Sequence, residues 1–511
     1  MTMPDPRPVS ADTDSAPRST RRALVFSFID RYAGLVISVA ASMAIARLLQ
    51  PQEIGVFSVA MALLMLANTV RDVGAGQFVI QAKELTTDHL RAVWALQLGV
   101  GVLLGVLVAA LAHPLARFYD EPRLKDILWV MAAAYFINPF GSITYAMLMR
   151  DMRFEHVALM RFAASASGAT LSITLAMGGH GPISLAWGSL ASTVANALTA
   201  LWFRPQGLPW MPGTRALREV IGFGGRMTGT SVTNALVAGS PDFLLGKLQG
   251  MVAAGYYSRS NGLVAMFSRL VTDAVYTVAT SFFAQQRREA VSVVPGFLRA
   301  MSYIAVLQMS YAVAVMLLAH PLTRLLYGMQ WDDTVPLTRW LAAAAAVASP
   351  VPMCVALCTA TGRADLALRA TLSSGLAMLT AVLLGASVDL ITMGMAVTLA
   401  AGLGAFAWLN SARAALERKL RWRELMSVLG RSGAVAVLAG AGPLMTVLVM
   451  GLKPATSWPP ALMGLASASA GLVAGLFLFR HPLADEVRRL SAGTLSRWRA
   501  HQQAAGWRPR A

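Results

Sequence analysis

The sequence predicts an all-α integral membrane protein of about 14 transmembrane helices, arranged as two similar six-helix lobes followed by two extra helices. Hydrophobic residues make up 56% of the 511 residues and charged residues only 13%, and the mean hydropathy is +0.56. A soluble chain is about a quarter charged. Apolar runs of about 20 residues recur along the whole chain, and each can cross a bilayer as one helix. An internal duplication supplies the evidence for two lobes.

The duplication is visible in two pairs of segments. LAHPL occurs at Leu111–Leu115 and again at Leu318–Leu322, each time before a short polar turn and an Ala-rich run. RLLQPQEIGVF from Arg47 resembles KLQGMVAAGYY from Lys247, which aligns Gly55 with Gly255. A period of about 200 residues is too long for a solenoid and is typical of membrane proteins built from two similar halves, which usually work at the interface between the halves. Neither LAHPL copy lies in a charged helix, so we expect the motif to build a lobe corner and to bind nothing.

The apolar runs divide the chain into lobes in order. We predict an N-lobe of six helices at 23–203, a C-lobe of six helices at 218–411, and two further helices within 429–480. The predicted spans are 23–46, 55–80, 92–112, 126–148, 157–177, 182–203, 218–241, 252–274, 297–319, 337–360, 366–386, 390–409, 429–452 and 459–479. Pro350 and Pro352 are expected to kink the tenth span.

The polar segments between these spans set the predicted orientation. Residues 1–22 are rich in Pro, Ser and Asp and predict a disordered tail, and 204–217 form a linker between the lobes. The loop 412–428 and the tail 481–511 are strongly basic. Lys and Arg concentrate in the segments that share a side with the N-terminus, which predicts that both termini are cytoplasmic.

Several functional classes are disfavoured by what the chain lacks. The net charge of +18 comes mostly from basic residues of the inner loops, and the sequence has no nucleic-acid-binding motif. There is no GxxxxGK[ST] motif, no metal-ligand spacing among the histidines, and no connection long enough for a catalytic domain. Cys354 and Cys358 have the character of packing residues. We therefore expect a transporter with no enzymatic activity, cofactor or metal.

Charged residues inside predicted spans are the candidate site residues, because each costs about 2.5–3.5 kcal/mol at bilayer depth. They concentrate in spans one, two, seven and eight, which are equivalent elements of the two halves. One interpretation is that the arginines line a shared cationic cleft suited to a phosphate or diphosphate. The other is that each arginine extends to the nearest membrane surface. The candidates for substrate binding are Arg31, Arg71, Arg226 and Arg259, and those for ion coupling are Asp30 and Asp72.

Short motifs across the second half resemble the bacterial polysaccharide exporters, an oligosaccharide flippase family related to multidrug exporters of the MATE type. Phe223–Gly224, Asp242–Leu245 and Gly255–Tyr257 match the family's Phe-Gly pair, its Asp before a Leu-Leu run, and its Gly before a Tyr pair. The segments LLYGMQW, ATGRADL and ARLLQPQEIGVFSVAMAL are also similar to the family. The family has an Asn two positions before the Asp, and this chain has Ser240 there. We therefore expect a structural role for Asp242.

The resemblance implies a MATE-like fold and a function. The implied activity is flipping an undecaprenyl-diphosphate-linked oligosaccharide from the inner to the outer leaflet of the bacterial cytoplasmic membrane, for lipopolysaccharide or exopolysaccharide synthesis. Related lipid-linked murein-precursor flippases use arginines of helices one, two and eight, and Arg71 and Arg259 are placed similarly.

The implied partners are the lipid-linked oligosaccharide, membrane lipids, and a polysaccharide polymerase with its co-polymerase, and a proton or sodium gradient is the implied energy source. Two other functions stay open. One is a cation-coupled drug exporter of the same fold, which would use a titrating carboxylate such as Asp30 or Asp72. The other is a membrane polysaccharide polymerase or ligase, which the short outer connections disfavour.

Overall fold

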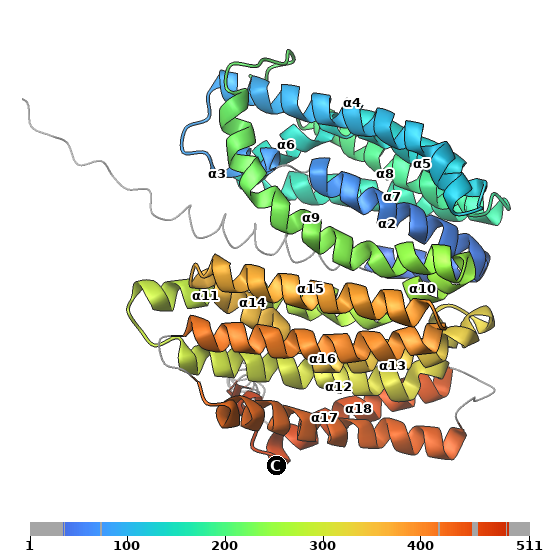
Figure 1. The fold of residues 1–511 in the computed structure, drawn as a ribbon, viewed down its shortest axis with the longest axis vertical. Coiled ribbons are helices and arrows are strands. Elements are labelled where there is room, and N and C mark those ends of the chain that lie inside the picture. The colour runs from blue at the N-terminus through green and yellow to red at the C-terminus, as the bar shows by residue number, and fades with distance from the viewer. Residues whose placement is uncertain are drawn as a thin grey trace, which may run out of the picture. The chain divides into compact units, whose positions relative to one another are not determined.

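The computed structural model describes residues 34, 36–71, 74–416, 420–451, 458–486 and 488–489, with the side chains of 223–231 left out of the description. Every regular element in this part of the chain is a helix (Figure 1). A helix at Val36–Leu48 precedes the labelled elements. They are α2 Pro51–Arg71, α3 Ala75–Gln81, α4 Thr87–Phe118, α5 Arg123–Ile137, α6 Pro139–Arg150, α7 Phe154–Met177, α8 Ile183–Trp202, α9 Leu217–Leu248, α10 Met251–Phe267, η1 Ser268–Thr272, α11 Asp273–Arg288, α12 Val294–Leu326, η2 Met329–Thr334, α13 Val335–Val347, α14 Val351–Ala360, α15 Ala364–Ala386, α16 Leu390–Ala415, α17 Trp422–Met450 and α18 Trp458–Leu478.

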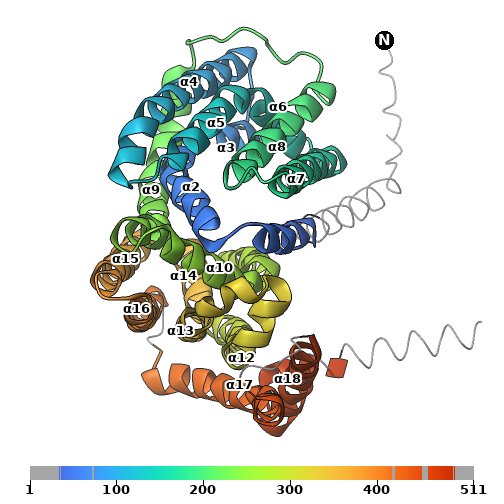
Figure 2. The ribbon, with the colours of Figure 1, turned by 90° about the vertical axis from the view of Figure 1, so that its right-hand side faces the viewer.

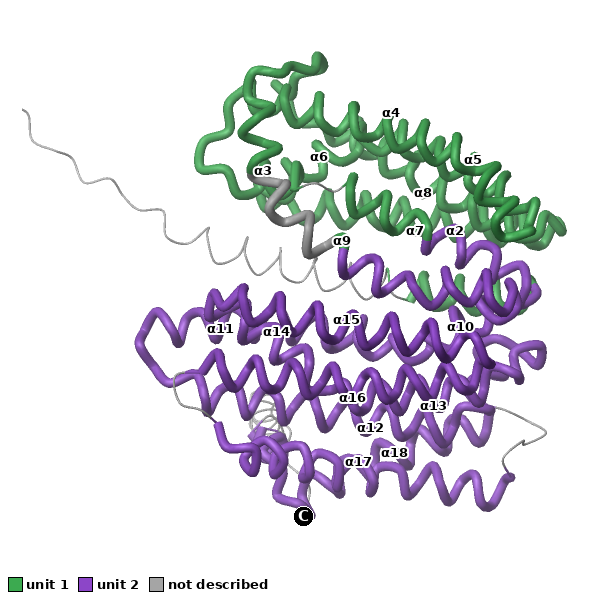
Figure 3. Tube along the Cα trace, viewed as in Figure 1, with its two compact units in different colours: residues 1–49, 63–232 green, residues 50–62, 233–511 purple. Residues whose placement is uncertain are grey.

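The chain divides into two compact units (Figure 3). Unit 1 comprises 1–49 and 63–232, and unit 2 comprises 50–62 and 233–511. Two of the three boundaries between the units fall inside helices, because α2 and α9 each contribute residues to both units. The lobe bounds 23–203 and 218–411 stay a prediction.

Unit 1 is built from antiparallel helix pairs. α4 packs along α5, α7 packs along α8, and α8 also contacts α5 and α6. One core cluster joins α3, α4 and α6 to the start of α9 through residues such as Phe78, Trp94 and Val220. Trp94 also donates its indole N–H to the carbonyl oxygen of Trp210 at 2.8 Å, which ties the connection between α8 and α9 to α4.

Unit 2 is centred on α12, which is more buried than the helices around it. It contacts α13, α17 and α18, and a second layer is formed by α15 packed along α16 (Figures 1 and 2). The core cluster includes Phe283, Phe297, Met353 and Trp408 and runs from α11 to the start of α17. α17 and α18 pack on each other and on α12.

Two of the predicted spans are broken. α5 and α6 are bent by 51° at Asn138, where Pro139 begins the second helix. The expected kink in the tenth span is confirmed as a break between α13 and α14 at residues 348–350, with Pro350 as the N-cap of α14 and Pro352 in its first turn. Proline lacks the N–H that would continue the helical ladder, so a new helix begins at each place.

The all-helical membrane class is confirmed, but the number of spans is not. Among the described residues, nine helices are long and apolar enough to cross a membrane, or ten if the bent pair α5–α6 is one span. α7 and α8 have 24 and 20 residues and lie outside that set, although they match the predicted spans in position. The expected 14 stays a prediction.

Candidate functional site

In unit 1, Arg71 lies at the edge of a polar cavity. It is the last residue of α2 and lines a cavity of about 320 Å³. Its guanidinium carbon is 5.9 Å from the centroid of the Tyr135 ring, within range of a cation–π contact. The polar residues that share the cavity wall with Arg71 are Gln77, Gln97, Asn138, Ser142 and Tyr145.

Hydrogen bonds hold this wall in place. The Tyr135 hydroxyl donates to Asn68 Oδ1 at 3.0 Å, which fixes the ring beneath Arg71. Ser142 donates to Gln97 across the cavity, so α4 and α6 are joined at the polar lining. Such amide and hydroxyl groups can satisfy the oxygens of a polar ligand within a chain that is otherwise apolar.

A second arginine reaches the same wall, and our sequence reasoning missed it. Arg161 of α7 donates to the Tyr145 hydroxyl, and its guanidinium carbon is 5.5 Å from the Tyr145 ring centroid. It lies only a few residues inside the predicted span 157–177. The depth criterion that selected Arg71 could therefore have drawn attention to Arg161 as well.

In unit 2, Arg259 lies between two aromatic rings. It is on α10, and its guanidinium carbon is 5.8 Å from the Tyr327 ring centroid and 5.9 Å from that of Trp331. Trp331 is fully buried and also packs edge-on to Tyr256 and Tyr327. The aromatic faces orient the guanidinium and compensate part of the cost of holding a cation among apolar groups.

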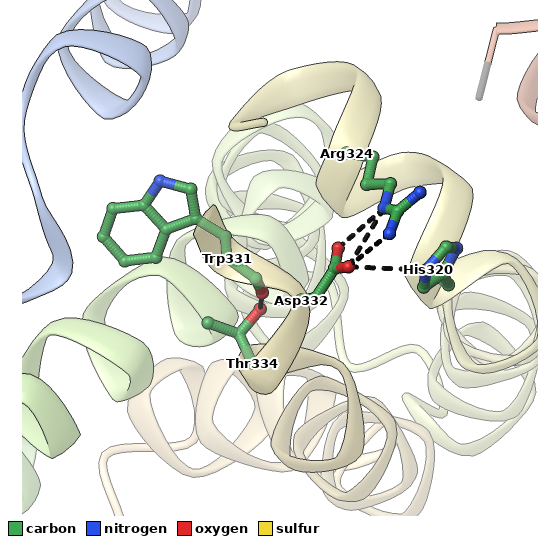
Figure 4. Close-up of polar contacts among 5 residues, drawn as sticks. All are labelled: His320, Arg324, Trp331, Asp332 and Thr334. Atoms are coloured by element: carbon green, nitrogen blue, oxygen red, sulfur yellow. Dashed lines mark hydrogen bonds and ion pairs between the residues drawn. The ribbon is translucent and has the colours of Figure 1, made fainter. Parts of the chain in front are cut away.

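The second LAHPL copy builds the corner that carries these rings. Arg324 holds Asp332 through contacts of 2.5–3.1 Å, and His320 Nε2 is 3.8 Å from the same carboxylate (Figure 4). Thr334 caps the turn by donating to the Trp331 carbonyl oxygen at 2.6 Å. Of the motif itself, His320 faces this corner. The turn that follows the motif presents Tyr327 and Trp331 to Arg259, which the sequence did not predict.

A further cavity in unit 2, of about 520 Å³, lies among α9, α10 and the helices α13–α16. Its polar lining residues are Asn234, Tyr257, Asn261, Thr371 and Ser374. The nearby carboxylate of Asp242 accepts a hydrogen bond from Ser58 Oγ at 2.9 Å. This bond joins the first turns of α2 to α9, which gives Asp242 a structural role.

The structure describes only part of the predicted site. Asp30, Arg31 and Asp72 lie outside the described residues, and Arg226 is on α9 with its side chain outside the description. Arg71 and Arg259 are each placed beside aromatic rings, but in different units. In the described part of the chain, no cluster of three or more His, Cys, Asp or Glu side chains is suited to a metal ion.

Residues 44–336 match the family model described as "Polysaccharide biosynthesis protein". The chain belongs to this family. The match covers more than half of the sequence, and it includes Arg71, Arg259 and the corner around Asp332. The resemblance seen in the short motifs of the sequence is therefore confirmed.

Curated relatives are similar over slightly more than 300 residues. The lipopolysaccharide biosynthesis protein WzxC of Escherichia coli strain K12 is 21% identical over 302 residues, covering 58% of this chain and 61% of the relative. The succinoglycan biosynthesis transport protein ExoT of Rhizobium meliloti strain 1021 is 24% identical over 315 residues, covering 60% and 62%. The alignments thus span less than two thirds of these relatives.

Solved structures share the fold. A structure of "Lipid II flippase MurJ, inward closed conformation" has a TM-score of 0.70 at 13% identity and covers 89% of this chain and 99% of that one. An inward-facing multidrug resistance MATE family transporter has a TM-score of 0.58 at 15% identity, with 81% and 100% covered. The predicted MATE-like fold is confirmed, and at these identities the likeness concerns the fold alone.

Proposed function

We propose that this protein flips an undecaprenyl-diphosphate-linked oligosaccharide from the inner to the outer leaflet of the bacterial cytoplasmic membrane. The observation that carries the proposal is Arg71, a guanidinium at a cavity lined by amides and hydroxyls within a membrane chain. Guanidinium groups bind phosphate oxygens in pairs, and amides and hydroxyls suit sugars. The similarity to WzxC and ExoT, which are named for lipopolysaccharide biosynthesis and succinoglycan transport, supports the same substrate class.

In the proposed mechanism, arginines bind the diphosphate in succession. Arg31, Arg71 and Arg226 would hold it in a cleft open to the cytoplasm, and Arg259 would engage it as the two halves rock. The rings of Tyr135 and of Tyr327 with Trp331 position the two described guanidiniums. Positioning matters because a guanidinium that is already oriented loses less conformational entropy when it binds the substrate.

The remaining features of the proposal follow from topology. Both termini would be cytoplasmic, because Lys and Arg concentrate in the segments on that side. The protein would act as a transporter without catalysis, driven by a proton or sodium gradient coupled through Asp30 or Asp72. A polysaccharide polymerase and its co-polymerase would take up the flipped product.

The test is transport in proteoliposomes that contain the purified full-length protein and a fluorescent undecaprenyl-diphosphate oligosaccharide. We expect the wild type to expose the label to an external quencher, and we expect Arg71→Ala and Arg259→Ala each to abolish this while the protein stays folded. Arg117→Ala, at an exposed position on α4, is the matched control and should retain transport. Normal flipping by both cavity variants would refute the site, and drug export without flipping would favour the exporter.

A further inference from the structure

Unit 2 has a basic hollow at a set of helix ends, separate from the cavities described above. It has a volume of about 270 Å³ and lies where α11, α14 and α16 end and where α12 and α15 begin. None of its lining residues borders the cavities of Arg71 or Asn234. The lining residues are Arg287, Ser292, Val293, Val294, Thr361, Arg363, Ala414, Ala415 and Leu416.

Two arginines, Arg287 and Arg363, line this hollow. A Cβ atom built on Gly362 would lie 3.7 Å from Arg287 Nη1, so the head of Arg287 lies beside the turn that carries Arg363. Gly362 has a φ of +68°, a conformation that favours glycine, and this turn reverses the chain between α14 and α15. Two arginines that are distant in sequence therefore line one hollow beside a tight turn.

The charge of the hollow is uncompensated within its own lining. No lining residue is acidic. Asp365, outside the lining, accepts from Arg363 Nε at 3.1 Å and from Nη2 at 3.3 Å. The hollow thus has two guanidiniums in its lining and one carboxylate paired with Arg363. Two positive charges at one hollow favour the binding of an anion.

We infer that this hollow is a binding site for a phosphate group, distinct from the proposed transport path. Paired guanidinium N–H groups match the oxygens of a phosphate, and the Ser292 and Thr361 side chains at the wall are also hydroxyl-bearing. The volume lies below the range of about 300–1,000 Å³ typical of drug-sized ligands, so the hollow suits a group as small as a phosphate-bearing head.

The phosphate can come from a lipid headgroup or from a soluble anion. Arg287 lies in a predicted inner connection, and basic pockets between helix ends on that side bind anionic lipid heads. Inorganic phosphate would use the same guanidinium contacts. The two sources share one chemistry, and the experiment separates them.

The experiment measures binding to the purified full-length protein in two settings. In neutral detergent micelles, inorganic phosphate is titrated against chloride at matched ionic strength, and the midpoint of thermal unfolding is followed. In nanodiscs of phosphatidylcholine, the fraction of phosphatidylglycerol is raised and the same midpoint is followed. We expect the wild type to be stabilised in at least one setting, because a ligand that binds only the folded state raises its stability.

Four variants test whether the response comes from this hollow. Arg287→Gln and Arg363→Gln should each weaken the apparent affinity roughly tenfold, the loss expected for a charge-assisted contact. Asp365→Asn should strengthen it, because the competing carboxylate charge is removed; a folding defect would not produce a gain. Arg288→Gln is the matched control, an exposed neighbour outside the lining, and should bind as the wild type does.

The outcomes decide the inference and the source. A response to inorganic phosphate alone identifies a soluble anion, and a response to phosphatidylglycerol identifies a lipid head. The inference is overturned if the wild type responds in neither setting, or if Arg287→Gln and Arg363→Gln keep the full response. Transport by the Arg71 and Arg259 variants is measured separately, so the failure of one proposal leaves the other standing.

Discussion

Gly55 of α2 and Gly255 of α10 make reciprocal contacts where the two helices cross. A Cβ atom on Gly55 would lie 1.7 Å from the carbonyl oxygen of Met251, and one on Gly255 would lie 2.0 Å from that of Pro51. The duplication aligns Gly55 with Gly255 and Pro51 with Met251. Each glycine therefore meets the backbone at the matching position of the other copy, which is the pattern that a local twofold axis requires.

At this crossing we expect even an alanine side chain to lower the stability of the protein. Gly55→Ala and Gly255→Ala should each destabilise the protein, because a methyl group at these distances must push the two backbones apart. Overpacking of this kind typically costs about 1–3 kcal/mol and sometimes more. The midpoint of thermal unfolding and the amount of protein in the membrane measure the effect.

A third glycine supplies the control for this prediction. Gly99 lies within α4, and nothing is within 4 Å of a Cβ built on it. Gly99→Ala should be neutral or stabilising by up to about 1 kcal/mol, since alanine is the better helix former. Equal loss of stability in all three variants would mean that the crossing is not the cause.

The rings around Arg259 predict a separable effect on transport. Tyr327→Leu removes one aromatic face from the guanidinium, whereas Tyr327→Phe keeps the ring and removes only the hydroxyl. A cation–π contact contributes about 0.5–2 kcal/mol, so Tyr327→Leu should slow flipping by about 2- to 30-fold. Tyr327→Phe should stay near the wild-type rate.

The measurement for this pair is the initial rate of flipping per amount of folded protein in proteoliposomes. Substitution of the buried Tyr327 can also lower the stability of the protein. Normalising the rate to the amount of folded protein separates that loss from an effect on the position of Arg259. Equal rates in Tyr327→Leu and Tyr327→Phe would show that the ring does not position the guanidinium.

The sequence predicted the helices better than it predicted contacts. Apolar runs identify membrane helices because backbone polar groups must be satisfied inside a bilayer. Arg71 and Arg259 were selected because a charged side chain is costly inside the bilayer. Their aromatic neighbours Tyr135, Tyr327 and Trp331 are far away along the chain, and no local pattern reports such a pairing.

Two further features were beyond the reach of periodicity. The duplication aligned Gly55 with Gly255, but an alignment does not show that the two residues are in contact. The division of the units inside α2 and α9 also could not be read from the polar connections on which the predicted lobe bounds rest. A long helix has no polar break where it passes from one group of neighbours to another, so composition cannot mark that point.

The two copies of LAHPL predict unequal responses to the same substitution. His320 is 2% exposed and lies beside Asp332, whereas His113 is exposed at the surface of the described chain. In the first copy the acidic residue Glu121 pairs instead with Arg123 at 2.7 Å. His320→Ala should lower stability by about 1–3 kcal/mol through a lost polar contact and a new void, and His113→Ala should leave it within about 0.5 kcal/mol.

Thermal unfolding of the two alanine variants in the same detergent makes this comparison. Asp332→Ala is the companion variant, because it removes the carboxylate that Arg324 holds. It should be at least as destabilising as His320→Ala, since it leaves a partly buried guanidinium without this carboxylate. Equal tolerance at both histidines would contradict the proposed role of the second copy as a structural corner.

His481 predicts a pH dependence of stability. It follows α18, is buried, and its Nε2 is 2.8 Å from Ser302 Oγ of α12 and 3.3 Å from Ser432 Oγ of α17. Its Nδ1 accepts the backbone N–H of Leu483 at 3.2 Å. Burial and the nearby charge of Arg431 lower the pKa of His481 to about 4, from an ordinary value of 6.5.

The sign of the effect follows from proton binding. Between pH 6.5 and about 4 the unfolded state binds a proton at this histidine and the folded state does not, so stability increases with pH across that window. The contribution is complete above pH 6.5 and is lost as the pH falls toward 4. We expect a loss of about 1–2 kcal/mol.

Two glutamine variants isolate this histidine. His481→Gln removes the titrating group and retains a donor for Ser302, so the dependence of the unfolding midpoint on pH should flatten between 4 and 6.5. His180→Gln, at an exposed position between α7 and α8, should leave the wild-type dependence unchanged. An unaltered slope in His481→Gln would assign the acid sensitivity to carboxylates elsewhere, because they titrate in the lower part of the same window.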